Sequence, residues 1–305
     1  MAIITKIIGI LWKFGATWGI FWTIAGTFGL SVPHPALNYP SLLALFVFVD
    51  IGFWLSVVQI FGNKFAKITK GSKGSELPSE QNYNCKVDYI LPFEGKWTVF
   101  NGGIGQGLSH SWGIIPQRYA YDFIIVDDKG KSFAGDNKKL ESYFCYGKNI
   151  IAPADGTVVQ VSNNHKDSRV TGEKVYCDTW DIRGNFIVLE HAKDEYSVCA
   201  HLIPGSIPAR KGDSVKQGDV IGKCGNSGNS SEPHLHFQLQ NGISFFASAG
   251  LPISFVNINA QEKTNYGMAD PRSSQKEVLP AREGTSVYIG RGLEVENGAE
   301  SDKRV

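Results

Sequence analysis

Short stretches of alternating apolar and polar residues recur between about residue 85 and residue 260, and they constrain the fold more than any other feature. They read VDYILPF, KWTVFNGG, RYAYDFIIV, GTVVQV, NFIVLEH, YSVCAHL, DVIGKCG and HLHFQLQ, with turn-forming residues between them. Alternation over this length is typical of β-strands, and many short strands separated by turns indicate a sandwich or barrel-like domain. We therefore predict an all-β domain over residues 85–260.

Residues 1–63 have a different composition. Residues 14–32 carry no charge, and residues 41–61 carry only Asp50. Each run matches the roughly 20 residues that cross a bilayer's hydrocarbon core, and SVPHPALNYP breaks the pattern between them. This predicts a membrane-spanning helical hairpin, while a buried pair of helices in a soluble protein remains the alternative.

A basic linker rich in Gly and Ser is expected over residues 64–84. Lysines at positions 64, 67, 70 and 73 follow the second apolar run directly. By the positive-inside rule this distribution would place the following domain in the cytoplasm. At the other end of the chain, residues 261–305 form a polar extension in which EGTSVYIGRGLEV predicts one possible strand.

Composition excludes some classes of function. The formal net charge of +1 over 305 residues gives no electrostatic reason to expect a nucleic-acid partner. The five cysteines include no C-x-x-C pair, which argues against a structural zinc ribbon. Their odd number leaves at least one thiol unpaired in the chain, and Cys145 with Cys177 is the pair worth testing as a disulfide. Nothing in the sequence indicates an oligomeric state.

The segment HLHFQLQ carries the strongest chemical signal. In a strand, His234 and His236 project to the same side, while Leu235 and Phe237 pack behind them. Two imidazoles on a rigid support suit a metal ligand beside a catalytic group, because zinc favours imidazole nitrogen. Taken alone, this pattern also fits histidines that a half-buried strand tolerates.

Two further segments place polar residues in apolar strands. Asp122 interrupts RYAYDFIIV, and a buried carboxylate needs a cation or a metal ion beside it. Arg118, four positions earlier, offers an ordinary salt bridge as the alternative. His201 ends YSVCAHL, where a histidine in the core or in a turn is the competing interpretation.

Together these segments resemble the lysostaphin-like zinc endopeptidases, which include the LytM-type cell-wall hydrolases. The resemblance runs from about Leu91 to Phe255 in the order ILPFEGKWTVFNGG, LSHSW, QRYAYDF, IIAPADGTVV, RGNFIVLEH, YSVCAHL, GDSVKQGDVIGKCGNSGNSSEPHLHF and GLPISF. It implies an antiparallel fold of the barrel-sandwich-hybrid type. It also implies a zinc metalloendopeptidase that hydrolyses peptide bonds in peptidoglycan crosslinks or stem peptides.

The resemblance assigns roles to individual residues. It makes Asp122 and His236 zinc ligands, and it makes His201 and His234 the catalytic histidines. The family commonly has a third ligand four residues before the aspartate, where this chain has Arg118, which cannot bind a metal. Because LSH looks like the Asn-x-His segment of a subgroup, we expect His110 to replace it. The alternative is that His110 is a surface residue and the zinc site is incomplete.

The hairpin implies a membrane-anchored enzyme, and a peptidoglycan substrate implies that its catalytic domain is extracytoplasmic, which conflicts with the lysine distribution. Two other functions remain open. One is a catalytically degenerate domain of the same fold that binds peptidoglycan or activates another hydrolase. The other is a biotinyl or lipoyl carrier, because ADGTVVQV and KGDSVKQGDVIG resemble its strands, although no lysine lies in the hairpin that such a carrier needs.

Overall fold

The computed structural model describes residues 77–170, 176–177 (backbone only), 181–269 and 286–298. The chain divides into two compact units, Met1–Val57 and Val58–Val305, and the following concerns the second unit. The predicted hairpin of residues 1–63 lies outside the described residues. Within the described ranges, every helix is too short or too polar to cross a membrane.

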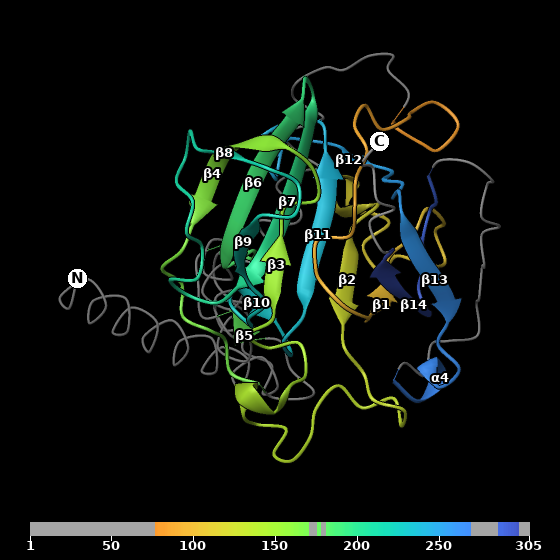
Figure 1. Cartoon of the computed structure of the whole chain (residues 1–305), viewed down its shortest axis with the longest axis vertical. Helices are drawn as coiled ribbons and strands as arrows, with labels where there is room; N and C mark the ends of the chain where they lie inside the picture. Colours follow the sequence, from red (N-terminus) through yellow and green to blue (C-terminus); the bar gives the residue numbers. More distant parts are fainter. Residues whose placement is uncertain (1–76, 171–175, 178–180, 270–285, 299–305) are drawn as a thin grey trace, which may run out of the picture. The chain divides into compact units, whose positions relative to one another are not determined.

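An antiparallel sheet dominates this unit, as Figure 1 shows. Its strands lie in the order β13-β14-β1-β2-β11-β7-β6-β4-β8, and β12 pairs with β11. Their bounds are β1 (Trp97–Asn101), β2 (Tyr121–Ile124), β4 (Gly156–Ser162), β6 (Asn185–Ala192), β7 (Glu195–Leu202), β8 (Ser214–Val215), β11 (Leu235–Gln240), β12 (Gly250–Leu251), β13 (Ile258–Glu262) and β14 (Leu293–Asn297). This architecture confirms the prediction of an all-β, antiparallel domain.

The remaining elements are short. Two small sheets pair β3 (Asn149–Ile151) with β9 (Val220–Lys223), and β5 (Tyr176–Cys177) with β10 (Asn229–Ser230). The described helices are η2 (Ile115–Gln117), η3 (Leu140–Ser142) and α4 (Tyr266–Ala269). Helices therefore contribute little to the support of any site.

One segment predicted as a strand is not one. VDYILPF makes only isolated bridges, at Tyr89 and Phe93, whereas each of the other predicted segments contains a strand. Pro92 lies between the bridges, and proline has no N–H to donate to a strand ladder. Its neighbours are nevertheless fully buried, so the alternation marked core residues correctly.

The two faces of the central strands differ in chemistry. On β11, Leu235, Phe237 and Leu239 are fully buried in the main hydrophobic core, as strand alternation requires. Each such side chain contributes roughly 1.5–3 kcal/mol through burial. The residues between them, His236 and Gln238, lie on the opposite face of the strand. The core thus fixes the backbone that carries these polar groups.

The cysteines provide no disulfide among the side chains described. Cys145 is a buried free thiol, and its Sγ lies 3.1 Å from the Pro233 carbonyl oxygen. The disulfide considered between Cys145 and Cys177 is therefore not formed, although the side chain of Cys177 lies outside the description. Cys199 and Cys224 are also buried free thiols.

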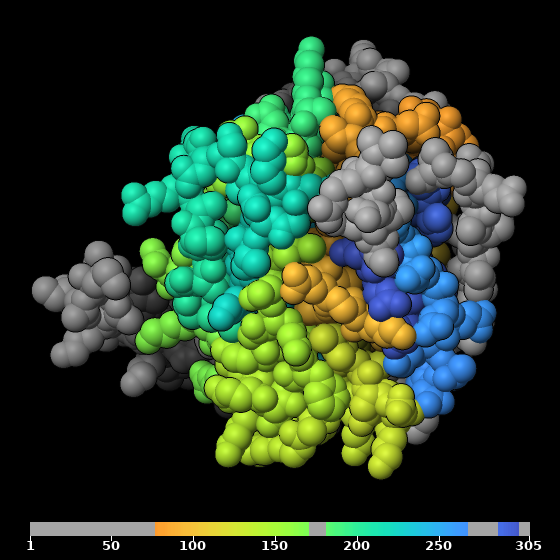
Figure 2. Space-filling model, viewed as in Figure 1, coloured from red at the N-terminus to blue at the C-terminus, as the bar shows by residue number. Residues whose placement is uncertain are grey.

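The C-terminal segment supplies a strand to the same sheet. β14 lies between β13 and β1, with Val295 opposite Trp97. Figure 2 shows residues 286–298 (dark blue) beside the segment that follows residue 77 (orange). The strand expected within EGTSVYIGRGLEV is therefore present at its C-terminal end. The domain boundaries given above remain predictions.

Candidate metal centre

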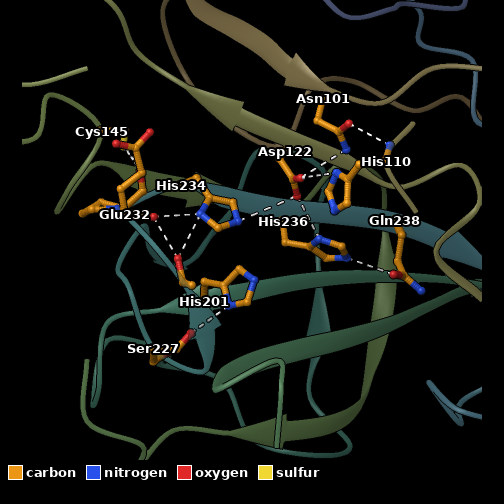
Figure 3. A network of polar contacts seen from close by, with 12 residues as sticks. Asn101, His110, Asp122, Cys145, His201, Ser227, Glu232, His234, His236 and Gln238 are labelled. Atoms are coloured by element: carbon orange, nitrogen blue, oxygen red, sulfur yellow. Dashed lines mark hydrogen bonds and ion pairs between the residues drawn. The ribbon is translucent and has the colours of Figure 1, made fainter. Parts of the chain in front are cut away.

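A cavity of about 430 Å³ lies over the polar face of the central strands. All five residues singled out from the sequence line it, and Figure 3 shows that separate parts of the chain converge there, with His234 and His236 on the same segment. They are His110, Asp122, His201, His234 and His236. The fold therefore brings together residues that are up to 126 positions apart (236 − 110).

Strand register places Asp122 beside His236. The two residues are opposite each other on β2 and β11, and His236 Nδ1 lies 3.0 Å from Asp122 Oδ1. His234, just before β11, also faces this carboxylate, with its Nε2 3.8 Å from Oδ1. The expected common orientation of the two histidines is thus observed.

His110 approaches the same carboxylate from the loop between β1 and β2. Its Nδ1 lies 3.6 Å from Asp122 Oδ2, and its side chain is 52% exposed. Asn101, at the end of β1, accepts a hydrogen bond from the His110 backbone N–H (3.0 Å) and donates one to Asp122 Oδ2 (3.2 Å). Asn101 therefore holds the loop and the carboxylate together.

Arg118 lies elsewhere. Its Nε donates a hydrogen bond to the Trp112 carbonyl oxygen (3.2 Å), and its guanidinium carbon lies 5.2 Å from the centre of the Trp112 ring. Among the ion pairs found in the described residues, those of Asp122 involve only histidines. The alternative of a plain Arg118–Asp122 salt bridge is therefore not observed.

His201 has an unusual backbone conformation. Its φ is +62°, a left-handed value that side-chain-bearing residues rarely adopt. Between the pairs Ile187–Cys199 and Asn185–Leu202, β7 has one residue more than β6, so His201 lies in a β-bulge. A bulge re-aims the local side chain. Here the His201 ring lies 4.7 Å from that of His234, centre to centre.

A chain of glutamines determines which nitrogen of His236 faces Asp122. Gln238 Nε2 donates to the Pro116 carbonyl oxygen (3.1 Å) and to Gln240 Oε1 (2.7 Å). Because a carbonyl oxygen can only accept, Gln238 Oε1 must be the atom that faces His236 Nε2, at 3.0 Å. Neutral His236 therefore carries its proton on Nε2 and directs the lone pair of Nδ1 toward Asp122.

The charges within the site perturb its titrating groups. Burial raises the pKa of Asp122, but the hydrogen bond that it accepts when His236 Nδ1 is protonated, and the nearby His234 and His110, lower it more, so the pKa lies far below its usual value. Burial, followed by the charges of His234 and His236, holds the pKa of His201 well below its usual value. Asp122 is therefore a carboxylate, and His201 is a neutral imidazole, at neutral pH.

These donors fit a zinc ion chemically. When the His236 imidazole is neutral, its Nδ1 lone pair faces the Asp122 carboxylate oxygen at 3.0 Å. Two acceptors this close repel each other, so a shared proton or a cation must lie between them. Imidazole nitrogen and carboxylate oxygen are common zinc donors, and two donors of a tetrahedral zinc lie about 3.3 Å apart. The separations of 3.0 and 3.6 Å lie on either side of that value. Yet no three such side chains in the described ranges already surround a single metal position.

Sequence analysis missed two residues of the site. Asn101 could have been noticed as a polar residue that ends an apolar strand before Gly-Gly. Gln238 follows His236 at the spacing that keeps strand residues on one face. Its contact with Pro116 joins segments 122 positions apart, so the sequence contained no signal for that contact.

Comparison with known proteins identifies a family for part of the chain. Residues 141–253 match the model of peptidase family M23. This match confirms the resemblance expected from the motifs, and it includes His201, His234 and His236. His110 and Asp122 precede it.

Individual relatives match over limited regions. An uncharacterised metalloprotease of Haemophilus influenzae is 33% identical over 102 residues, which is 33% of this chain and 18% of that protein. The murein hydrolase activator NlpD of Salmonella dublin is 29% identical over 40% of this chain and 28% of its own length. The peptidoglycan DD-endopeptidase ShyA of Vibrio cholerae is 38% identical over 30% of this chain and 17% of its own length. The matches thus span less than a third of each relative.

Among solved structures, the catalytic domain of lysostaphin from Staphylococcus simulans aligns with 57% of this chain and 95% of that domain. The sequence identity is 23% and the TM-score is 0.28.

Proposed function

We propose that this chain, whose residues 141–253 belong to peptidase family M23, is a zinc-dependent endopeptidase that hydrolyses peptide bonds in peptidoglycan crosslinks or stem peptides. The observation that carries the proposal is the convergence of His110 and His236 on the Asp122 carboxylate within one cavity. In this proposal these three side chains hold the metal, and His201 and His234 act on the substrate. The lysostaphin-like, barrel-sandwich-hybrid form of the fold is part of the same proposal.

The bound zinc ion would lower the pKa of a water molecule and polarise the scissile carbonyl group. The chain's own residues would then move the protons. His201 Nδ1 lies 2.7 Å from the Ser227 carbonyl oxygen, and His234 Nδ1 lies 2.8 Å from the Glu232 carbonyl oxygen. Because these oxygens only accept, each ring carries its proton on Nδ1 and leaves Nε2 free to accept one.

Either histidine can therefore act as the general base at Nε2. After accepting a proton there, the ring can donate it to the leaving amine, as general acid–base catalysis requires. The other ring is then available to stabilise the oxyanion. The division of these two roles between His201 and His234 stays open.

A second candidate function is activation of another cell-wall hydrolase, which the similarity to a murein hydrolase activator favours. A degenerate activator has no need of a complete set of ligands and catalytic histidines. Asp122, His201, His234 and His236 are all present here and line one cavity. We therefore favour catalysis.

The zinc content of the full chain separates the two functions. We expect about one equivalent of zinc, measured by mass spectrometry of the metal, and release of soluble fragments from purified peptidoglycan. Less than about a tenth of an equivalent at saturating zinc would refute the peptidase proposal.

Two variants separate the metal from the catalysis. His236→Ala should lose both zinc and peptide hydrolysis, because it removes a metal donor. His201→Asn should retain zinc and lose hydrolysis, since asparagine tolerates the left-handed φ of +62° but cannot act as a base. Hydrolysis by either purified variant at the wild-type rate would contradict the assigned roles.

We also propose that residues 1–63 anchor the chain in a membrane and that the catalytic domain is extracytoplasmic, where peptidoglycan lies. The lysine cluster of residues 64–73 argues for the opposite side. Protease treatment of intact spheroplasts should degrade the domain if it is outside. Protection until the membrane is lysed would instead support a cytoplasmic domain.

A further inference from the structure

Arg183 lies in the wall of the cavity, and two of its three guanidinium nitrogens donate hydrogen bonds. Its Nε and Nη2 donate to the two carboxylate oxygens of Asp181, at 3.0 and 2.7 Å. The Phe186 ring centre lies 3.6 Å from the guanidinium carbon. These contacts fix the group, and the side chain is only 7% exposed.

The third nitrogen, Nη1, has no hydrogen-bond partner although it is buried. An unsatisfied buried donor costs about 1–3 kcal/mol, more for a charged group. Such groups are rare in folded proteins. An acceptor that enters the cavity would remove this cost.

The backbone of Arg183 is also hydrogen-bonded to that of His201, one of the two candidate catalytic residues. Its carbonyl oxygen accepts a hydrogen bond from the His201 backbone N–H at 3.0 Å. The Phe245 ring centre lies 5.1 Å from the guanidinium carbon, and Phe245 lines the same cavity. Because Nη1 is buried, an entering group reaches it only if a neighbouring side chain moves.

We propose that Arg183 Nη1 binds a backbone carbonyl oxygen of the peptide substrate near the bond that is cut. The inference rests on the proposed function, because it assigns one subsite of the same cavity. A carbonyl oxygen suits the site better than a carboxylate, since Asp181 already neutralises the guanidinium. A second carboxylate would leave a net negative charge in a wall that is largely desolvated.

The test measures peptide binding, so that it does not depend on turnover. The full chain carrying His201→Asn is titrated calorimetrically with a synthetic cross-linked stem peptide, with and without Arg183→Met. We expect Arg183→Met to raise the Kd about tenfold, which corresponds to about 1.4 kcal/mol. Arg210→Met removes an exposed arginine outside the cavity, and it should leave the Kd unchanged.

Peptides with a single thioamide, a weaker acceptor, identify the oxygen involved. A thioamide at one peptide position should weaken binding to the chain that carries His201→Asn alone. The same thioamide should have no further effect when Arg183→Met is also present. The double variant Asp181→Asn/Arg183→Met, which also removes the carboxylate that Arg183 contacts, should bind as Arg183→Met does. A loss that follows amidation of the peptide's carboxyl terminus instead would overturn the carbonyl assignment in favour of a carboxylate.

The possible failures are distinguishable. If the wild-type chain cleaves the peptide and Arg183→Met neither changes its binding nor alters the thioamide pattern, only the inference about Arg183 is wrong. If the parent protein binds no cross-linked peptide and the wild type cleaves none, the proposed function and this inference are both wrong.

Discussion

Gln238 fixes the orientation of His236, one of the proposed metal donors. Its amide is fixed by the Pro116 carbonyl oxygen and by Gln240, so its own oxygen accepts the Nε2 proton of His236. In neutral His236 the lone pair of Nδ1 therefore points toward Asp122, at 3.0 Å from Oδ1. Partners of this kind commonly change metal affinity 10- to 100-fold.

We expect Gln238→Met to weaken zinc binding about 10-fold or more while the chain remains folded, because methionine has similar length but accepts hydrogen bonds poorly. Competition with a chelator of known affinity measures the effect. Gln261→Met is the matched control, since Gln261 is exposed on β13 and bonds only to Glu294. Equal zinc affinities for the two variants would show that Gln238 does not orient His236.

The bulge in β7 and a contact between two loops hold the His201 ring in position. The Ser227 carbonyl oxygen that orients its ring is followed by Gly228, which packs against Gly184, just before β6. A Cβ on Gly228 would lie 2.4 Å from the Gly184 nitrogen and 2.5 Å from the Ile182 carbonyl oxygen. Both atoms belong to the backbone, so neither can yield easily.

Gly228→Ala should therefore lower both stability and activity. Its φ of +81° costs about 1 kcal/mol for alanine, and the backbone clash adds to that cost. Gly205→Ala is the control, because Gly205 has a φ of +75° and open space around it. The free energies of unfolding and the hydrolysis rates of the two variants should be compared. A similar loss in both would mean that the clash is relieved by movement and that His201 is not disturbed.

The sequence predicted those elements whose chemistry is local. Alternation over HLHFQLQ predicted β11 and the common face of His234 and His236, because side-chain direction in a strand follows from spacing alone. The bulge at His201 has no such local signal, since only a small fraction of histidines adopt a left-handed φ. The register that places Asp122 opposite His236 depends on the pairing of strands far apart in the chain, which spacing does not specify.

Within the second unit, the C-terminal segment is part of the sheet that carries the candidate site. β14 pairs with β1, β1 pairs with β2, and β2 carries Asp122. The Asn297 side chain bonds to the backbone of Leu91 and of Phe93. The polar composition after residue 260 suggested an extension, because β14 buries only Val295 of its five residues and so has little apolar signal.

This arrangement predicts the outcome of two truncations. Ending the full chain after residue 285 removes β14, and with it the buried Val295 and the Asn297 hydrogen bonds. Burial of valine contributes about 1.5–3 kcal/mol, and each hydrogen bond about 0.5–1.5 kcal/mol. We expect a melting temperature lower by roughly 5 °C or more and weaker zinc binding, because β1 supports both Asn101 and β2. Ending the chain after residue 298 retains β14 and should change neither property. Equal melting temperatures for the two truncated chains would show that β14 does not stabilise the sheet beneath the site.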